Sequence, residues 1–429
     1  GNSDAELYAS DPGDWVIYDA ADLAALSKKV SDGSTFSGCT ITLASDIDLS
    51  GHMWVPIGQY IDVPSGQSVE RSFQGTFLGG RHKITGMRFT SISYYGSEKI
   101  PQDVGLFGRI RNAAITDLTV EGNVYYEIPR RGGSTSAGGI VGIMLSSTLR
   151  NCGFVGSVYS RYRDTSRSFA QYSGGLAGQM REQSIISNCF AIADVTTIHS
   201  VGPAFSGGLV GTAANFSDGK AVIENCYSAC NVWSQGREEA SLVGAFVAQT
   251  YYVPINNCYG EAGFNQNGIT SDKGGTYISK ATAQAASGTV FDGNETPLVD
   301  ALNGYIEDTW RTDGTLDMRS WIVDPGKNDG YPVYGAAVAA KLDSGFTSPV
   351  VQHLAQGGTA DASLFQTPDK YLVEWYADED YTTAFDFSQP IYDNTLVYGK
   401  LTSNTFPITY VLNGGQNAAS NPAGYFRGD

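Results

Sequence analysis

The chain has 429 residues, which allows two or three domains with sizeable cores. Its 52 Gly and 25 Tyr, against five Met and a charged fraction of 17%, are typical of an extracellular β-protein with many tight turns. The net charge of -17 argues against nucleic acids and anionic membrane surfaces as partners. No apolar run is long enough to span a bilayer. We therefore expect a monomer with no direct membrane insertion.

The first 58 residues are predicted to form an N-terminal cap and the first strands. A short strand is expected at 15–18, followed by a helix that begins after Asp19 and ends at Gly33. The apolar face of this helix holds Leu23, Leu26 and Val30. Such a helix would cover an open first sheet edge, which otherwise invites aggregation.

Two acidic residues of this region, Asp46 and Asp48, suggest a calcium site at first sight. We favour the interpretation that both side chains make turn and ladder hydrogen bonds at a strand edge, because Asp side chains readily bond to nearby backbone groups. The sequence therefore predicts no metal site and no cofactor.

Residues 59–275 are predicted to form the β-helix and contain four copies of one sequence motif. Each copy has a short segment followed by an Asn-Cys pair, and the Asn recurs at 151, 188, 225 and 257. The segment is glycine-rich in the first three copies and keeps one glycine in the fourth. The copies are Gly138–Gly142 with Asn151-Cys152, Gly174–Gly178 with Asn188-Cys189, Gly207–Gly211 with Asn225-Cys226, and Ser241–Gly244 with Asn257-Cys258. Val104–Gly108 with Asp117-Leu118 is an earlier relative of the motif. This period is typical of stacked repeats, in which each unit buries its apolar face on its neighbours.

The Asn-Cys segment indicates how each strand bends. Ile186 and Cys189 are three residues apart, so on a straight strand they would face opposite sides. Both are apolar, which predicts a kink between them at Asn188, since Asn tolerates the left-handed conformation. Stacked Asn side chains could exchange amide hydrogen bonds. The pattern predicts an all-β, right-handed parallel β-helix with helical caps.

Four of the six cysteines occupy one repeat position, and Cys39 and Cys230 lie outside it. Stacked strands would bring the four α-carbons within disulfide range. The same position is Leu118 in the first repeat, so buried free thiols are expected, with some disulfide as the alternative. No Cys or His spacing suggests zinc.

The repeats resemble the GLUG motif of bacterial surface proteins. The segment 73–86, Phe-Gln-Gly-Thr-Phe-Leu-Gly-Gly-Arg-His-Lys-Ile-Thr-Gly, is similar to the rung that usually precedes it. The resemblance covers roughly residues 12–340 and implies a β-helix. GLUG-type β-helices serve as adhesin stalks, as parts of secreted proteases and as carbohydrate-active scaffolds.

Beyond the repeats, a helix is predicted near 297–307, and residues 276–345 are expected to cap the β-helix. A domain boundary is placed near Gly345, where the composition changes. Residues 346–402 resemble the Listeria-Bacteroides repeat, or internalin-type B-repeat, through 368–378, 383–387 and 396–401. The resemblance implies a small β-grasp-like spacer module, with Leu372 and Trp375 near its core. Residues 403–429 are interpreted as the start of a second, truncated copy.

No catalytic group emerges from the sequence. Nucleophile and zinc-peptidase signatures are absent, and the four histidines lack metal-ligand spacing. The carboxylates of the repeats occupy scattered positions, namely Asp117, Glu121, Asp194 and Glu224. The Arg-Gly-Asp tripeptide at 427–429 is attributed to chance.

A ligand-binding edge is predicted after Val124, Val158, Val195 and Val232, which are expected to end equivalent strands. The following loops are rich in Arg and aromatic residues, which suit sugar rings and anionic groups. Solvated loops with packed tyrosines are the alternative. The candidate binding residues are Tyr126, Arg130, Arg131, Arg161, Tyr162, Arg163, Arg167, Trp233 and Arg237.

These features favour a non-catalytic adhesin or stalk on the bacterial cell surface, anchored by a segment outside this sequence. Its expected partner is a host glycan or an extracellular-matrix protein. A secreted polysaccharide-degrading enzyme or its carbohydrate-binding part is one alternative. A purely structural surface protein is the other.

Overall fold

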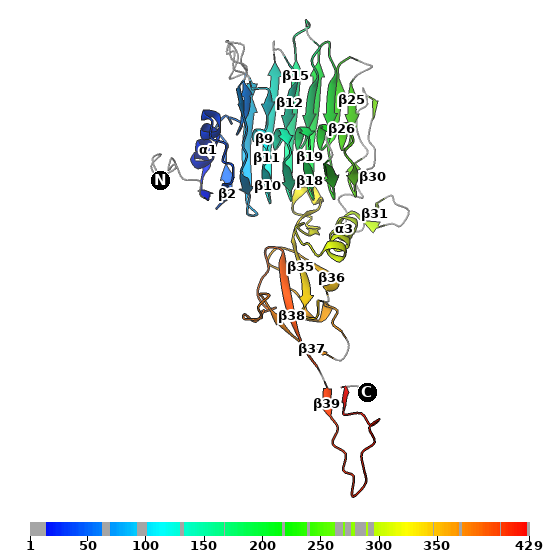
Figure 1. Ribbon diagram of the computed structural model, residues 1–429. Helices are drawn as coiled ribbons and strands as arrows, with labels where there is room; N and C mark the ends of the chain where they lie inside the picture. Colours follow the sequence, from blue (N-terminus) through cyan, green and yellow to red (C-terminus); the bar gives the residue numbers. More distant parts are fainter. Residues whose placement is uncertain are drawn as a thin grey trace. The chain divides into compact units, whose positions relative to one another are not determined.

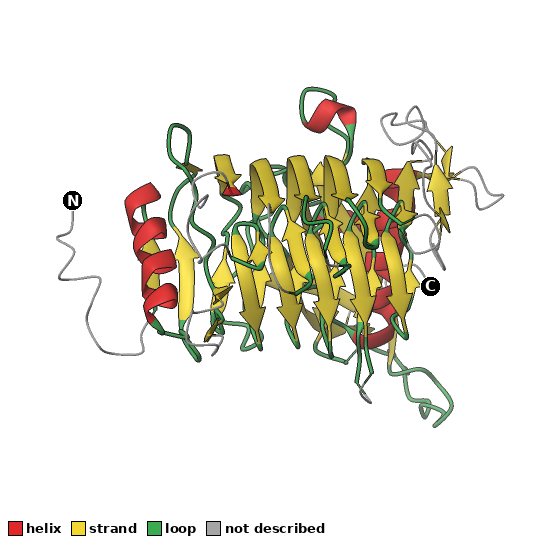
Figure 2. Ribbon diagram, turned by 90° about the horizontal axis from the view of Figure 1, so that it is seen from above, coloured by secondary structure: helices red, strands yellow, loops and turns green. Residues whose placement is uncertain are grey.

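The computed structural model describes residues 14–61, 69–91, 101–128, 133–166, 168–216, 219–237, 241–261, 269–270, 276–278, 289–290, 296–345, 347–368, 371–403 and 405–426. The chain divides into two compact units. The first unit comprises residues 1–302 and 325–331, and the second comprises 303–324 and 332–429. The first unit is a parallel β-solenoid of about five turns, which confirms the predicted all-β parallel β-helix (Figures 1 and 2).

Each complete turn of the β-helix contributes one strand to each of four parallel walls. The first wall consists of β8 (Asp103–Val104), β12 (Thr135–Gly138), β16 (Gln171–Gly174), β20 (Ala204–Gly207), β25 (Leu242–Gly244) and β29 (Ile269–Thr270). The second wall consists of β9 (Phe107–Arg111), β13 (Val141–Leu145), β17 (Ala177–Arg181), β21 (Val210–Ala214) and β26 (Val247–Tyr251).

The third and fourth walls meet at the Asn positions. The third consists of β1 (Trp15–Ile17), β2 (Thr40–Leu43), β6 (Thr76–Leu78), β10 (Ala114–Thr116), β14 (Thr148–Arg150), β18 (Ile185–Ser187), β22 (Val222–Glu224) and β27 (Ile255–Asn256). The fourth consists of β3 (Ile47–Asp48), β7 (Lys83–Thr90), β11 (Thr119–Ile128), β15 (Gly153–Tyr162), β19 (Phe190–His199), β23 (Tyr227–Ser228), β24 (Asn231–Gln235), β28 (Tyr259–Glu261) and β30 (Thr276–Ile278).

The corner between the third and fourth walls is made by Asn residues in the left-handed conformation. Their φ angles are 53° at Asn151, 55° at Asn188, 51° at Asn225 and 47° at Asn257. Each side-chain amide donates to the preceding turn, with Asn188 Nδ2 2.8 Å from Asn151 Oδ1 and Asn225 Nδ2 2.7 Å from Asn188 Oδ1. The ladder begins at Asp117, which accepts from Asn151, and its last member donates to Asn225 and to the carbonyl of Ala301.

The cysteine after each Asn lies inside the β-helix. The thiols of Cys152, Cys189, Cys226 and Cys258 are free and buried. Burial is the main cause that raises the pKa of Cys152, Cys189 and Cys226 well above the ordinary value. They behave as small core residues rather than as nucleophiles.

The glycine-rich segment forms the tight turn from the first wall to the second. A Cβ on Gly175 would lie 2.3 Å from the carbonyl oxygen of Gly208 in the next turn. A Cβ on Gly142 would lie 2.5 Å from the backbone nitrogen of Val104 in the preceding turn. The motif therefore exists because neighbouring turns approach backbone to backbone, with no room for side chains.

Helix α1 (Ala20–Asp32) packs on β1 at the N-terminal end of the β-helix (Figure 2). Asp19 caps it by accepting from Ala21 and Asp22, and Gly33 ends it at φ 117°. Its apolar face, Leu23, Leu26 and Val30, is completely buried. The hairpin of β4 (Gln59–Ile61) and β5 (Val69–Arg71) follows.

The acidic residues Asp46 and Asp48 accept hydrogen bonds from backbone N–H groups at the strand edge. Asp48 Oδ1 accepts from the backbone of Ser50 at 2.8 Å, and this bond is the main cause that lowers the pKa of Asp48. Asp46 Oδ1 accepts from the backbone of Lys83 at 3.0 Å.

The second unit contains a four-stranded mixed sheet in the order β36-β35-β38-β37. Its strands are β35 (Ala336–Leu342), β36 (Thr347–Leu354), β37 (Tyr371–Tyr376) and β38 (Thr395–Ser403). Because β35 and β36 form a hairpin, the boundary predicted near Gly345 is wrong: the change of composition marks the hairpin turn. Residues 303–324 and 332–345 belong to this unit rather than to a cap of the β-helix.

Both faces of this sheet are covered. Ala336, Val338, Ala340 and Val397 pack on one side, and Ala337, Ala339, Val351 and Trp310 pack on the other. The ring of Trp375 packs on the first cluster, and Gly399 leaves the space for it. Leu372 is 52% exposed, so its predicted place near the core is wrong. It is three residues from Trp375 on a straight strand and therefore faces the other side.

The remaining elements are short apart from one helix. Helix α3 (Leu298–Asp313) buries Leu298, Leu302 and Ile306 and extends beyond the predicted end at 307. The others are β31 (Thr289–Val290), β32 (Thr296–Pro297), β33 (Trp321–Ile322), η2 (Asn328–Gly330), β34 (Val333–Tyr334), η3 (Ala362–Leu364), β39 (Thr405–Pro407) and β40 (Gly424–Phe426).

Candidate ligand-binding surface

The strands of the fourth wall continue past the valines that were predicted to end them. Parallel pairing runs in register to Ile128, Tyr162 and His199. Beyond Val158, Val195 and Val232 the next inward side chain is polar, because it faces the first wall rather than the apolar core. Ser160 bonds to the amide of Gln171 there, and Thr197 bonds to Ser206 at 2.7 Å.

Two predicted binding residues are consequently buried rather than exposed in loops. Tyr126 is 0% exposed, and its hydroxyl donates to the carbonyl of Pro101. Tyr162 is 1% exposed, and its ring stacks on His199 with centroids 4.7 Å apart. Both residues stabilise the wall and cannot contact a ligand on its surface.

An aromatic column lies on the outer face of the fourth wall. Its register positions are Tyr125, Tyr159, Thr196 and Trp233, on four successive turns. Tyr125 and Tyr159 stack with centroids 5.0 Å apart and planes 6° apart. Trp233 faces outward because its neighbours Val232 and Ser234 are buried at 1% and 0% exposure.

Thr196 breaks the column between Tyr159 and Trp233. These two residues are two strand spacings apart, or about 9.6 Å along the backbone. A ring in van der Waals contact with a flat group on each side needs about 7–8 Å. The break is thus wide enough to admit one saturated ring between the two aromatic side chains.

A column of polar side chains runs beside the aromatic one. It consists of Asn123, Ser157, Asp194 and Asn231 in register. Ser157 Oγ donates to Asn123 Oδ1 at 2.7 Å, and Asn231 Nδ2 donates to Asp194 Oδ1 at 2.8 Å. Asp194 and Asn231 flank the break at Thr196 and offer hydrogen-bond donors and acceptors there.

On the other side of the aromatic column, Glu127 occupies the position next to Arg161. The hydroxyl of Tyr125 donates to Glu127 Oε2 at 2.6 Å, and Arg163 forms an ion pair with the same carboxylate. The side chain of Glu127 is only 5% exposed. Arg163 therefore neutralises a buried carboxylate.

The other predicted residues of this edge have varied positions. Arg161 is half-buried on β15, and Arg237 is exposed after β24. Arg130, Arg131 and Arg167 lie outside the described residues. The structure thus brings Arg161 and Trp233 to the surface around Thr196 and removes the two tyrosines from it.

Near the Asn corner, aromatic side chains cover the fourth wall at β19 and β23. Phe190 and Tyr227 stack there at 5.3 Å, and Tyr331 stacks on Tyr227 at 6.2 Å. Burial is the largest cause that raises the pKa of Tyr227 well above its ordinary value.

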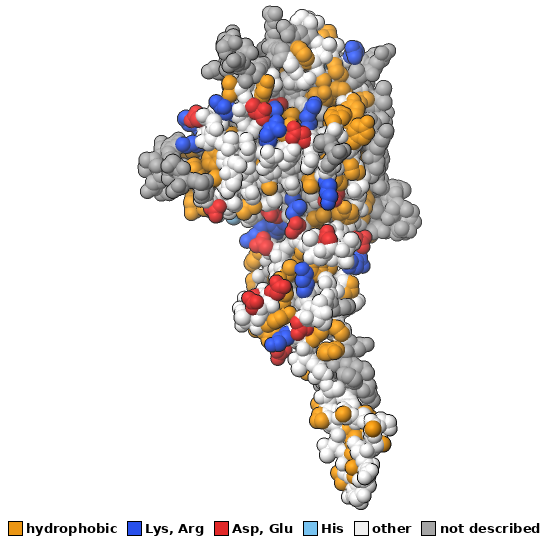
Figure 3. All heavy atoms as spheres, in the orientation of Figure 1, with side chains coloured by type: hydrophobic (Ala, Val, Ile, Leu, Met, Phe, Trp, Pro, Cys, Tyr) orange, Lys and Arg blue, Asp and Glu red, His pale blue; other side chains and the backbone are white. Residues whose placement is uncertain are grey.

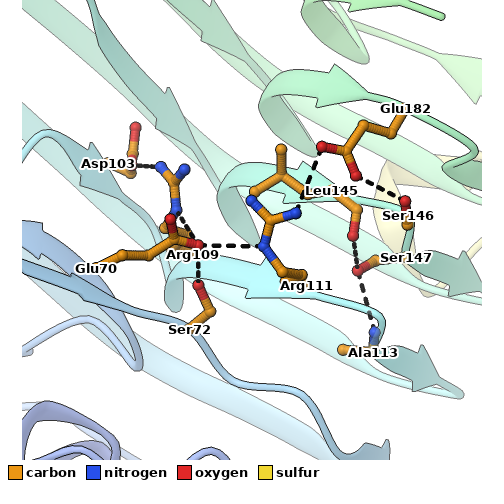
Figure 4. A network of polar contacts seen from close by, with 10 residues as sticks. All are labelled: Glu70, Ser72, Asp103, Arg109, Arg111, Ala113, Leu145, Ser146, Ser147 and Glu182. Carbon is orange, nitrogen blue, oxygen red and sulfur yellow. Dashed lines mark hydrogen bonds and ion pairs between the residues drawn. The ribbon is translucent and has the colours of Figure 1, made fainter. Parts of the chain in front are cut away.

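The second wall carries a network of charges on its outer face (Figure 4). Arg109 Nη1 lies 2.8 Å from Asp103, and Arg109 and Arg111 both lie 3.2 Å from Glu70 Oε1. Arg111 also reaches Glu182 at 3.4 Å. Burial disfavours the charge of Arg109, but its two carboxylates outweigh burial and raise its pKa. The network joins β5 to the β-helix.

A chain of three residues in the second unit was not apparent from the sequence. Ser320 Oγ lies 2.7 Å from His353 Nδ1, and His353 Nε2 lies 3.2 Å from Glu307 Oε1. These are the residue types of a nucleophile, a base and an orienting carboxylate. Ser320 is 0% exposed, so in this conformation no substrate reaches its hydroxyl. These two hydrogen bonds link strand β36 to helix α3 and to the segment around residue 320.

His199 makes the fourth wall sensitive to pH. Its Nδ1 accepts from the backbone nitrogens of Val201 and Gly202 at 3.1 and 2.8 Å. Burial lowers its pKa, against smaller opposing effects of Phe169 and Asp164. The unfolded chain therefore binds the proton more readily, and stability falls as the pH drops through about 6.5.

We expect His199→Asn to remove this contribution, because Asn can accept the same bonds without titrating. Between pH 7.5 and 5.5 the native chain should lose up to about 1 kcal/mol more unfolding free energy than the variant. Urea unfolding of both proteins at the two pH values measures this. Parallel losses in the two proteins would contradict the assignment to His199.

No family model matches the chain, and no curated protein matches it. Among solved structures, the chain is similar to a Bacteroides ovatus protein named, provisionally, an immunoglobulin A1 protease. The TM-score is 0.42 and the identity 16%, over 78% of this chain and 97% of that chain. None of the described helices is long and apolar enough to cross a membrane.

Proposed function

We propose that this chain is a non-catalytic bacterial surface adhesin whose β-helix binds a glycan on the outer face of the fourth wall. The observation that carries the proposal is the break at Thr196, between Tyr159 and Trp233. Aromatic faces pack on the apolar faces of sugar rings, and Asp194 and Asn231 lie where sugar hydroxyls would need partners. A rigid wall supports this arrangement, which favours preorganised binding.

The location and the family form part of the same proposal. The chain acts outside the cell, on the bacterial surface, as the GLUG-like repeats and the Listeria-Bacteroides-like segment suggest. The second unit serves as a spacer. Aromatic and polar columns along a stacked scaffold suit an extended ligand such as an oligosaccharide.

Trp233→Ala is expected to weaken oligosaccharide binding about thirtyfold, equivalent to about 2 kcal/mol, because it removes one side of the ring site. Cellotetraose, maltotetraose and tri-N-acetylglucosamine are suitable neutral probes for isothermal titration calorimetry. Tyr159→Ala should have a similar effect. Tyr18→Ala is the matched control, since Tyr18 is a 62% exposed aromatic residue far along the chain.

The outcomes separate the proposal from its rivals. Binding that survives in Trp233→Ala would place the ligand elsewhere. Absence of binding across glycan and matrix-protein arrays would contradict the adhesin and favour a structural protein. Release of reducing ends from the probes would show that the chain is an enzyme.

A further inference from the structure

A second group of aromatic side chains gathers where the second wall turns toward the third. Figure 3 shows hydrophobic side chains over β25 and β26. Phe216 is 73% exposed, Tyr252 is 81% exposed and Tyr251 is 42% exposed. The ring of Phe216 lies 5.8 Å from that of Tyr251 and 6.2 Å from that of Tyr252. Exposed aromatic residues clustered in this way mark interaction sites.

The outer residues of the first and second walls face one another. Gln179 on β17 donates to Ser136 on β12 at 2.6 Å, which fixes this geometry. Tyr172 is the register neighbour of Ser136, and it stacks on Phe205 at 5.0 Å. Tyr172 therefore lies beside the outer residues of the second wall. Burial raises its pKa, with smaller effects from Arg181, which lowers it, and Tyr251, which raises it.

Tyr252 is held in an unusual backbone conformation. Its φ is 58°, in the left-handed region that bulky residues rarely adopt. The corresponding turns of the preceding coils use Asn112, Ser146 and Glu182, with φ of 50°, 45° and 59°. A bulky, exposed ring at a strained turn position is a feature that accumulates at functional sites.

Arg181 lies in the same register column as Tyr251, two turns earlier, and its guanidinium is oriented but not neutralised by a described carboxylate. Its Nε donates to Gln179 Oε1 at 2.7 Å. Within the part of the chain that the structure describes, no carboxylate pairs with Arg181. Arg111, two turns earlier in the same column, pairs with both Glu70 and Glu182. The difference leaves the guanidinium of Arg181 able to accept an external anion.

We infer that Tyr172, Arg181, Phe216, Tyr251 and Tyr252, the Arg181 patch, bind a carboxylated sugar such as a uronate or a sialate. The aromatic rings contact the sugar ring, and the guanidinium pairs with its carboxylate. Because the protein carries a net charge of -17, long-range electrostatics do not attract an anionic sugar. The sugar carboxylate must therefore make direct contact with the guanidinium. The inference rests on the proposed glycan-binding function and adds a second site on different walls.

The test compares matched acidic and neutral sugars. Calorimetry with 3′-sialyllactose against lactose, and trigalacturonate against galactotriose, identifies a preference for carboxylate and tells sialate from uronate. The native chain should bind at least one acidic member of a pair about tenfold more tightly or better, since a charge-assisted pair adds this much. Equal affinity within both pairs would overturn the inference.

Arg181→Gln should abolish the acidic preference, and Arg181→Lys should restore part of it. Arg88→Gln, which removes an exposed charge from the fourth wall, is the control and should keep the preference. Tyr251→Ala should weaken acidic binding with the charge intact. If Arg181→Gln and Arg88→Gln bind the acidic sugar equally, the site is wrong. Neutral-sugar binding that depends on Trp233 would remain, so the failure of this inference and that of the proposed function are distinguishable.

Discussion

Gly175→Ala is expected to destabilise the β-helix by about 3 kcal/mol or more, the upper range of overpacking. The new Cβ would lie 2.3 Å from the carbonyl oxygen of Gly208 and 2.7 Å from the Cβ of Ala191. Neither neighbour can move easily, because one is backbone and the other belongs to the facing wall. Thermal unfolding should shift downward by roughly 6–12 °C.

Gly304→Ala is the matched control for this experiment. A Cβ there meets nothing within 4 Å, and the residue lies in helix α3, where Ala is the better helix former. This variant should melt at the native temperature or slightly above it. If both variants unfold at the same temperature, the glycine motif is not required for the close approach of successive turns.

The second large effect is expected at the centre of the Asn ladder. Asn188→Ala removes the hydrogen bonds to Asn151 and Asn225 and leaves their amide groups buried without these partners. Each unsatisfied group costs about 1–3 kcal/mol, and placing Ala at φ 55° adds about 1–2 kcal/mol. Urea unfolding should show a loss of about 3–8 kcal/mol, or failure to fold.

Asn188→Gly separates the two causes, because glycine adopts the left-handed conformation without strain. It should recover about 1–2 kcal/mol relative to Ala and no more. Asn231→Ala is a control for a stacked Asn that is exposed, and it should cost less than about 1 kcal/mol. Equal losses at positions 188 and 231 would show that burial does not strengthen the ladder.

The β-helix could be predicted because its corner violates strand alternation. Ile186 and Cys189 are both apolar and three residues apart, which only a kink at Asn188 allows. The length of the fourth wall could not be predicted in the same way. Its strands continue past Val158 with Ser160 facing the first wall, so the apolar pattern stops while the strand does not.

The candidate site was located only in part. The surface positions of Trp233 and Arg161 were predicted because aromatic and Arg residues recur after the core valines. Thr196 gave no signal, since its importance lies in separating Tyr159 from Trp233 on neighbouring turns. The Arg181 patch was missed because its residues come from the first and second walls and from three turns, and only the folded backbone brings them together.

The register of the fourth wall is unbroken from β11 to β24, so distances along this part of the protein change in steps of one strand spacing. From β11 to β24 every outer column of the fourth wall gains one residue with each turn, and the register does not shift. Duplicating one complete turn would therefore lengthen all columns together, by one strand spacing, and leave each local contact intact. Such a protein can adapt to longer or differently spaced ligands by copying whole turns, whereas a single-residue insertion within a strand would reverse the faces of that strand.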